Sequence, residues 1–237
     1  MIVKRDFYVG FRMVEENLEM KSGEMLNIFI DIAGIHSESV GDGFDSESRW
    51  ILTGYNVRIY RKPRYTETVT FITWSRDYNQ AIATREFEIR DKEGNLLVCA
   101  LSQFVRFNIK TRKFDKITND IMLSYESENS RTNFDGEKVK RFIDKGEYDG
   151  WIFDEVDWKW IDLNHHMNNS HYIDLALHIL KGAGVDADGY SFEINYKQEI
   201  KEGERIKILY KKGDNGYTVA IKSEDEKTLF AGIEFYK

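Results

Sequence analysis

The chain has 237 residues, of which 41% are hydrophobic and 14% aromatic, and this composition excludes a disordered or low-complexity protein. Its 34 Lys and Arg against 41 Asp and Glu give a net charge of −7, which disfavours general nucleic-acid binding. No apolar run reaches the roughly 18 residues that a membrane-spanning helix needs. The first residues resemble neither a signal peptide nor a transit peptide, so we expect a cytoplasmic protein. The single cysteine, Cys99, excludes an intrachain disulfide and a cysteine-based metal cluster.

The first half of the sequence predicts a strand, a long helix and then antiparallel strands. A strand-like run covers residues 7–14, and apolar residues at three- and four-residue spacings between Met25 and Val40 predict the helix. From residue 51 onward the apolar residues alternate with polar ones, which is typical of half-buried strands. The polar run Asp91 to Asn95 predicts a hairpin turn between two of them.

The second half predicts the same order of elements. A strand is expected around residues 151–153, followed by a helix whose apolar stripe runs from Tyr172 to Ile179 and which ends near Gly182 and Gly184. The strands predicted after this helix cover residues 190–200, 205–211, 217–223 and 229–236.

A long helix followed by an antiparallel meander predicts a sheet curled around that helix, which is the hotdog arrangement. Two copies in one chain predict an α+β fold of the tandem, or double, hotdog type. We expect an N-terminal hotdog over residues 1–117 and a C-terminal hotdog over 148–237. Residues 118–147 are polar and irregular and are interpreted as a linker, with a short helix predicted from Gly136 to Lys145.

The chemically most informative stretch lies just before the second predicted helix. In an extended chain Asp162, Asn164 and His166 would project to one side, beside a helix N-terminus capped by Asn168 or Asn169. The free N–H groups there are suited to stabilising an oxyanion. The structural alternative is a polar turn that only caps the helix. The counterpart in the first half, around residues 20–23, lacks such a triplet, so one active site per chain is expected.

The run from Asp162 to Asn169, followed by Tyr172-Ile173, resembles the Asp-x-Asn-x-His-Val-Asn-Asn signature of the fatty acyl-acyl-carrier-protein thioesterases of plants and bacteria. The resemblance covers nearly the whole chain. Further matching segments are Arg49-Trp50, residues 57–64, Thr73-Trp74, Ile89 to Asp91, and Tyr196 to Ile200, which resembles a plant Tyr-Arg-Arg-Glu-Cys segment. The resemblance implies a bacterial enzyme, without cofactor or metal, that releases free fatty acid from acyl carrier protein and so terminates fatty acid synthesis.

The resemblance also implies the catalytic residues, which are Asp162, Asn164, His166 and Glu199. Ile200 stands where plant enzymes carry a cysteine, and Cys99 lies in an apolar strand, so we expect water as the nucleophile. Either Glu199 or His166 serves as the general base, Asn164 positions water or the carbonyl group, and Asp162 orients its neighbours.

Glu199 also has a purely structural interpretation. In the predicted strand it shares a polar face with Glu193, Asn195 and Lys197, which is the pattern of a solvated strand face.

The implied partner, acyl carrier protein, is strongly acidic, so local clusters of positive charge are its candidate docking sites. The first cluster comprises Arg58, Arg61, Lys62 and Arg64, and the second Arg106, Lys110, Arg112, Lys113 and Lys116. The N-terminal hotdog is expected to bind the acyl chain. Its candidate lining residues, which would serve equally well as core, are Met25, Ile28, Phe29 and Ile32.

Other functions remain open at this point. An acyl-CoA thioesterase shares the phosphopantetheine thioester, a hotdog hydratase uses an Asp/His pair, and a non-catalytic sensor would bind acyl thioesters without hydrolysis. The Asn164 and Glu199 matches favour hydrolysis. A tandem repeat is compatible with a monomer or a homodimer, and the preferred acyl chain length does not follow from the sequence.

Overall fold

The structure is a computed structural model that describes residues 1–44 and 46–237. It contains two compact units. Unit 1 comprises residues 1–21 and 27–139, and unit 2 comprises residues 22–26 and 140–237. Within the described ranges, no helix is both long enough and apolar enough to cross a membrane.

Unit 1 is built on an antiparallel sheet with the strand order β1-β3-β4-β5-β2, and the short strand β6 pairs with β5. The strands are β1 (Ile2–Tyr8), β2 (Ser48–Ile59), β3 (Thr68–Tyr78), β4 (Ala83–Arg90), β5 (Leu96–Asn108) and β6 (Lys113–Asp115). The predicted turn at Asp91 to Asn95 joins β4 and β5, and Gly94 takes the positive φ of 87° that this turn requires. The strand predicted at residues 7–14 is wrong in its bounds, because β1 ends at Tyr8 and a 3-10 turn (Phe11–Met13) follows.

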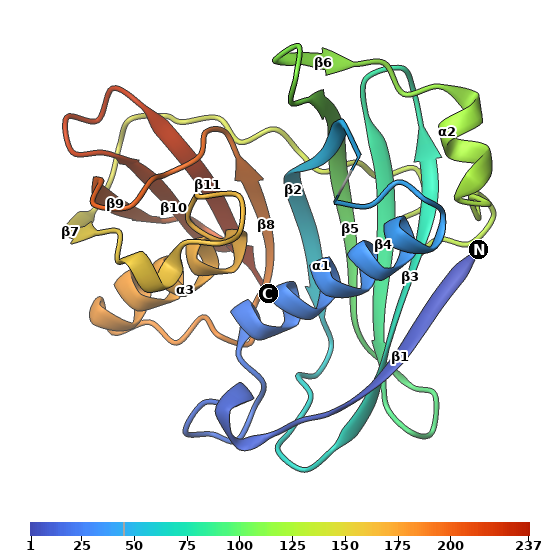
Figure 1. Cartoon of the computed structure of the whole chain (residues 1–237). Helices are drawn as coiled ribbons and strands as arrows, with labels where there is room; N and C mark the ends of the chain where they lie inside the picture. The colour runs from blue at the N-terminus through green and yellow to red at the C-terminus, as the bar shows by residue number, and fades with distance from the viewer. Residues whose placement is uncertain (45) are drawn as a thin grey trace. The chain divides into compact units, whose positions relative to one another are not determined.

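The predicted long helix is confirmed as α1 (Ser22–Ser39), which crosses the face of the unit 1 sheet (Figure 1). Its Phe29 side chain is fully buried and stacks on Phe87 of β4 with ring centroids 4.6 Å apart. Phe71 of β3 and Tyr55 of β2 complete this aromatic contact. The helix is therefore held by aromatic packing against successive strands, which is how a hotdog sheet encloses its helix.

The segment predicted as a linker packs against the units instead of bridging them freely. The boundary between the units falls at residues 139 and 140, within that segment. Its helix is α2 (Asn119–Ser124), which begins at Thr118 because the Thr118 side chain accepts the Ile121 N–H. The helix predicted from Gly136 to Lys145 is wrong. Positive φ angles at Gly136 and Gly146 flank a stretch without helical hydrogen bonds.

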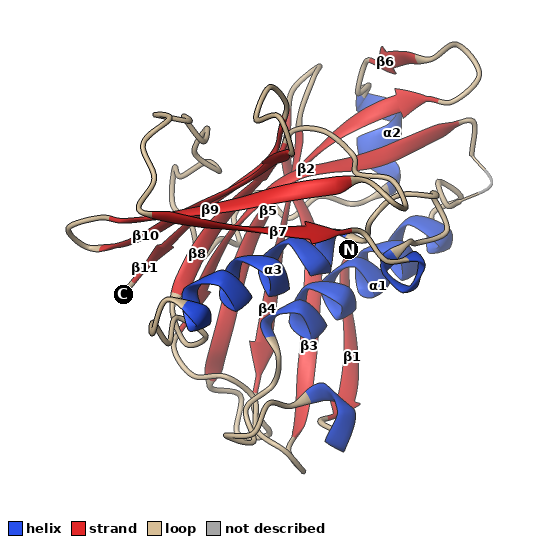
Figure 2. Ribbon diagram, turned by 90° about the vertical axis from the view of Figure 1, so that its left-hand side faces the viewer, coloured by secondary structure: helices blue, strands red, loops and turns tan. Residues whose placement is uncertain are grey.

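Unit 2 repeats the element order of unit 1. A 3-10 turn (Trp158–Trp160) and the helix α3 (Asn169–Gly182) precede a meander, and α3 packs against β9, β10 and β11 (Figure 2). The sheet has the strand order β8-β11-β10-β9-β7. Its strands are β7 (Gly150–Glu155), β8 (Ser191–Tyr196), β9 (Arg205–Lys212), β10 (Gly216–Ser223) and β11 (Leu229–Tyr236).

Strand β8 differs from its prediction in length and in burial. It ends at Tyr196 instead of residue 200, and two of the polar residues predicted to be solvated, Glu193 and Asn195, are 3% and 7% exposed. The Lys140 N–H donates to Glu193 Oε2 at 3.0 Å and the Phe142 N–H to Asn195 Oδ1 at 3.0 Å. The Asn195 amide in turn donates to the Lys140 carbonyl at 2.8 Å. The solvated-face interpretation is therefore wrong for Glu193 and Asn195, which residues 140–142 cover, whereas Lys197 and Glu199 are exposed.

Replacing Phe134 by alanine should destabilise unit 1 by about 3–5 kcal/mol, because its ring is fully buried against Cys99 and Leu101 and the change would leave a cavity. Urea unfolding of the full chain measures this loss. Phe114→Ala is the matched control, since that ring is 72% exposed. A loss below about 1 kcal/mol for Phe134→Ala would mean that the segment is only loosely associated with unit 1.

Candidate active site

The segment from Ile161 to Met167 forms a tight turn, so the prediction of an extended chain is wrong. The Asp162 N–H donates to the His166 carbonyl at 2.9 Å, and the His165 N–H donates to the Asp162 carbonyl at 3.0 Å. His165 takes a positive φ of 64°, which reverses the chain. An isolated bridge between Ile161 and Met167 closes the turn at its base.

The physical reason for the turn is the side chain of Asp162. Its Oδ1 atom accepts the Asn164 N–H at 2.7 Å, which is an Asx turn and competes with extended backbone. The Asn164 amide also donates weakly to Asp162 Oδ2 at 3.5 Å. The side-chain amide oxygen of Asn164 accepts no hydrogen bond from the described residues, and the side chain is exposed. Asp162 therefore fixes Asn164 and leaves its amide oxygen open to solvent.

His166 and Glu199 form the closest contact between two side chains of the predicted catalytic residues. His166 Nε2 lies 2.8 Å from Glu199 Oε2, and the side chains are 31% and 51% exposed. Glu199 lies in the loop that follows β8, not in the strand itself. An imidazole and a carboxylate in hydrogen-bond contact are the usual pair for general acid–base work.

Backbone hydrogen bonds hold the turn against the Glu199 loop. The Met167 N–H donates to the Ile200 carbonyl at 2.8 Å, one residue beyond each partner of the His166–Glu199 pair. On the other side of Glu199, the N–H groups of Lys197 and Gln198 share the Phe230 carbonyl at 2.8 and 3.2 Å. The loop is therefore tied to the fold on both sides of its carboxylate.

The helix α3 begins directly after the turn, as predicted. Asn168 is its N-cap, and the Asn168 side chain accepts the Ser170 N–H at 2.9 Å. The N–H of Asn169, the first helical residue, has no acceptor among the described residues. A free N–H at a helix N-terminus, with the helix dipole behind it, is suited to an anionic oxygen.

Unit 1 contains a turn with the same backbone. The Glu15 N–H donates to the Glu19 carbonyl at 2.9 Å, and Leu18 has a φ of 65°. Val14 and Met20 form the bridge at its base, and the Met20 N–H donates to the Pro63 carbonyl at 2.8 Å. The counterpart of the candidate site therefore spans Val14 to Met20, not residues 20–23. This internal repeat supports the predicted duplication at the level of single hydrogen bonds.

The side chains in the two turns differ where the chemistry would be. Glu19 occupies the position of His166, and Lys62, which precedes Pro63, occupies that of Glu199. Asn17 replaces Asp162 as the residue that makes the Asx turn, since its Oδ1 accepts the Glu19 N–H at 2.9 Å. The backbone turn is thus part of the repeat architecture. Of the two turns, only the one in unit 2 carries the imidazole–carboxylate pair.

Other candidate nucleophiles and bases are buried or structural. Cys99 is fully buried, and burial raises the pKa of its thiol to about 11, so no thiolate is available there. His36 is fully buried with its Nδ1 atom 3.1 Å from Arg85 Nη1. His171 stacks on Trp160 with ring centroids 5.5 Å apart.

The four residues predicted to line the acyl channel are all buried. Their exposed fractions are Met25 1%, Ile28 5%, Phe29 0% and Ile32 0%. Phe29 contacts aromatic rings of the sheet, as core residues do. Their role in binding an acyl chain stays a prediction.

The first predicted docking cluster is largely neutralised by neighbouring carboxylates. Arg58 pairs with Glu137, while Arg61 lies 3.0 Å from Glu67. Arg64 lies 3.8 Å from Glu19, and Lys62 is only 2% exposed. In the second cluster, Arg106 pairs with Asp42 at 2.6 Å. Carrier docking at either cluster stays a prediction, with less free positive charge than the sequence indicates.

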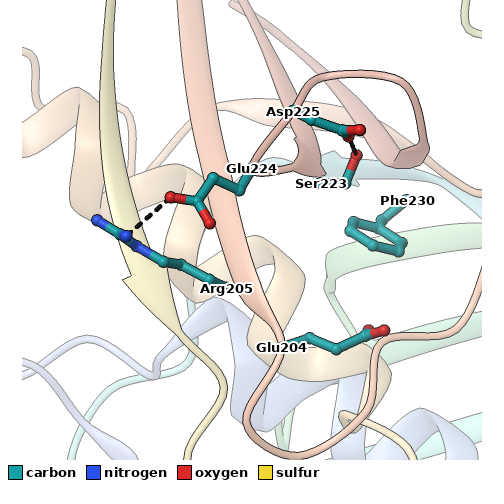
Figure 3. A pocket seen from close by; sticks show the side chains of 6 residues that line it. All are labelled: Glu204, Arg205, Ser223, Glu224, Asp225 and Phe230. Carbon is teal, nitrogen blue, oxygen red and sulfur yellow. Dashed lines mark hydrogen bonds and ion pairs between the residues drawn. The ribbon is translucent and has the colours of Figure 1, made fainter.

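An open pocket of about 480 Å³ lies in unit 2. Figure 3 shows an ion pair between Arg205 and Glu224 at one side of it and a hydrogen bond between Asp225 and Ser223 at another, with the Phe230 ring below Asp225 and Ser223 in this view. Its lining residues are Glu204, Arg205, Ser223, Glu224, Asp225 and Phe230. Three carboxylates make this pocket unsuited to an acidic carrier or a phosphate.

The two units define a tandem hotdog protein whose second repeat carries an Asp-Asn-His turn opposite a glutamate. Residues 1–125 match the N-terminal domain of the acyl-ACP thioesterases, where ACP denotes acyl carrier protein, and residues 146–233 match their C-terminal domain. The chain belongs to the acyl-ACP thioesterase family.

Relatives and solved structures agree with this assignment. The oleoyl-acyl carrier protein thioesterase 1 of Arabidopsis thaliana is 23% identical over 87% of this chain and 62% of its own length. The corresponding protein of Coriandrum sativum is 25% identical over 87% of the chain and 61% of its own length. The chain thus spans about three fifths of the length of these curated relatives.

The solved structures establish the fold over the full chain. An acyl-ACP thioesterase from Bacteroides thetaiotaomicron has a TM-score of 0.85 at 20% identity and covers 99% of this chain and 97% of its own. The 12:0-ACP thioesterase from Umbellularia californica has a TM-score of 0.84 at 19% identity and covers 99% and 96%. The predicted tandem hotdog is confirmed.

His36 should titrate near pH 4 instead of near its usual pH 6.5, because burial and the neighbouring Arg85 guanidinium lower its pKa to about 4. Nuclear magnetic resonance of the histidine ring protons against pH measures this directly. Since the depressed pKa favours the neutral ring in the folded state, folding stability linked to His36 is present above pH 6.5 and is lost as the pH falls toward 4. Titration of His36 at its ordinary pKa would contradict the burial described here.

Proposed function

We propose that this protein hydrolyses the thioester of fatty acyl-acyl carrier protein and releases a free fatty acid. The observation that carries the proposal is the His166–Glu199 contact of 2.8 Å beside the N-terminus of α3, in a member of the acyl-ACP thioesterase family. The relatives' names support the substrate, since they are described as oleoyl-acyl carrier protein thioesterases.

In this mechanism His166 is the general base and Glu199 orients it. With the neutral ring donating its Nε2 proton to Glu199, the Nδ1 lone pair is left to accept a proton from water. The Glu199 carboxylate stabilises the imidazolium that forms. Glu199 thereby also fixes the tautomer of the base, the role that a carboxylate commonly has toward a catalytic histidine.

The hydroxide generated at His166 adds to the thioester carbonyl carbon, and the carbonyl oxygen takes up the electron pair as an oxyanion. The free Asn169 N–H at the start of α3 stabilises this oxyanion, while Asn164, held by Asp162, positions the attacking water. The C–S bond then breaks, and the thiolate leaves as the carboxylic acid forms. A thiol has a pKa of roughly 8.5, so the leaving group needs little protonation, and the imidazolium returns its proton to the thiolate or to solvent.

Two substitutions test the assignment. His166→Ala and Glu199→Gln should each lower kcat by about 10²–10⁴-fold, the usual contribution of general acid–base catalysis. The readout is free thiol released from a panel of acyl-acyl carrier protein substrates of different chain length. His165→Asn is the control for the first change, since His165 is the adjacent exposed imidazole and asparagine tolerates its positive φ. Glu202→Gln is the control for the second.

The alternatives predict other outcomes in the same assay. If acyl-CoA is hydrolysed at least as efficiently as acyl-acyl carrier protein, the carrier assignment fails and an acyl-CoA thioesterase remains. A protein that binds acyl-acyl carrier protein tightly without any turnover is a sensor. Equal activity in His166→Ala and His165→Asn would refute the proposed base.

A further inference from the structure

Arg141 and Lys197 of unit 2 form a pair of neighbouring positive charges without an acidic partner among the described residues. Seven other basic side chains of this unit differ from them, because each lies in an ion pair with a carboxylate. Their pairs are Lys140–Glu193, Lys159–Asp157, Arg205–Glu224, Lys207–Glu226, Lys211–Glu147, Lys222–Asp144 and Lys227–Asp225.

The Lys197 ammonium is hydrogen-bonded to a buried amide. It donates to Asn195 Oδ1 at 3.2 Å, and Asn195 is only 7% exposed. The backbone on both sides of Arg141 clamps that amide, since the Phe142 N–H donates to its oxygen at 3.0 Å and its nitrogen donates to the Lys140 carbonyl at 2.8 Å. The buried amide thus joins the segment that carries Arg141 to the segment that carries Lys197.

This arrangement is costly unless an anion compensates it. Partial burial and the charge of Arg141 lower the pKa of Lys197, so the folded chain holds an ammonium beside a guanidinium in a place that disfavours the ammonium. The exposed faces of both residues remain open to solvent. A bound anion would relieve the like-charge repulsion and receive charge-assisted hydrogen bonds from both donors.

We propose that Arg141 and Lys197 bind the phosphodiester through which the phosphopantetheine arm is attached to the acyl carrier protein. The inference rests on the proposed thioesterase function and extends it to a recognition site for the carrier arm. A local positive site has a clear use here, because the chain carries a net charge of −7 and would otherwise repel an acidic carrier.

The position along the chain fits this role. Lys197 lies two residues before Glu199, and its side chain reaches back to Asn195, four residues before Glu199. Four extended residues span at most about 14 Å. The arm places two amide units between its phosphate and its sulfur, so a phosphate at Lys197 and a thioester at the His166–Glu199 pair can belong to one molecule. The acidic pocket lined by Glu204 and Glu224 has the wrong charge for the phosphate.

The binding test does not depend on turnover. Isothermal titration calorimetry compares 4′-phosphopantetheine with pantetheine, which lacks the phosphate, on the wild-type protein. We expect wild type to bind the phosphorylated arm about tenfold more tightly, the value of one charge-assisted contact, and Arg141→Ala and Lys197→Met to lose this preference. Lys212→Met is the control, because Lys212 is an exposed lysine at the end of β9. Absence of a phosphate preference in wild type would refute the inference, even if the protein is a thioesterase.

The kinetic test separates recognition from positioning of Glu199. With acyl-acyl carrier protein, the Arg141→Ala/Lys197→Met double variant should raise KM by about tenfold or more at an unchanged kcat, and added salt should raise the wild-type KM toward that value. With acyl-pantetheine, wild type and double variant should have the same kcat/KM. An equal loss on both substrates would overturn the proposal, since Lys197 would then act through the Glu199 loop. An effect with acyl-CoA but none with the carrier substrate would overturn the assignment to the carrier.

If neither substrate is hydrolysed by wild type, the thioesterase proposal fails while the calorimetric result still decides the phosphate site. If both substrates are hydrolysed and the phosphate preference is missing, the thioesterase proposal stands and the phosphate site is refuted. The two proposals can therefore fail separately.

Discussion

A single backbone hydrogen bond, from the Met167 N–H to the Ile200 carbonyl, sets the geometry on which the candidate site depends. It joins two segments more than thirty residues apart, and His166 and Glu199 each lie one residue before its ends. The equivalent bond from Met20 to Pro63 in unit 1 holds the same turn without the catalytic side chains. This hydrogen bond is therefore a feature of both repeats, and unit 2 differs by carrying the candidate catalytic residues His166 and Glu199 beside it.

Charge pairing decides which surfaces remain available to an acidic partner. The first cluster in the sequence contains four basic residues within seven positions, yet the structure pairs Arg58, Arg61 and Arg64 with acids and buries Lys62. Arg141 and Lys197 are far apart in the sequence, and the fold places them side by side with no acidic partner among the described residues. Density of positive residues in a sequence is thus a weaker indicator of docking than positive charge left uncompensated after folding.

Local signals were sufficient for the two long helices and for most hairpin strands of unit 2, but not for the short helix α2. Apolar spacing placed α1 and α3, and the Asn168 cap placed the start of α3. Features that depend on distant contacts were not predictable in the same way. The Asp162 side chain turned an apparently extended segment into an Asx turn, and residues 140–142 buried Glu193 and Asn195. The contact between His166 and Glu199 has no local signature, and it was anticipated only through the family resemblance.

The candidate site and the interior of unit 1 handle polar groups in opposite ways. Arg85 and His36 are buried, and burial lowers the pKa of both groups. The protonation state of each group therefore depends on the residues that surround it. His166 and Glu199 remain 31% and 51% exposed, so bringing them together costs little desolvation. Their positions are fixed by backbone hydrogen bonds instead of by burial. The backbone hydrogen bonds hold the turn in place, while the reactive side chains remain exposed to solvent. These side chains can therefore be substituted without disrupting the turn, which explains how one repeat carries the imidazole–carboxylate pair and the other does not.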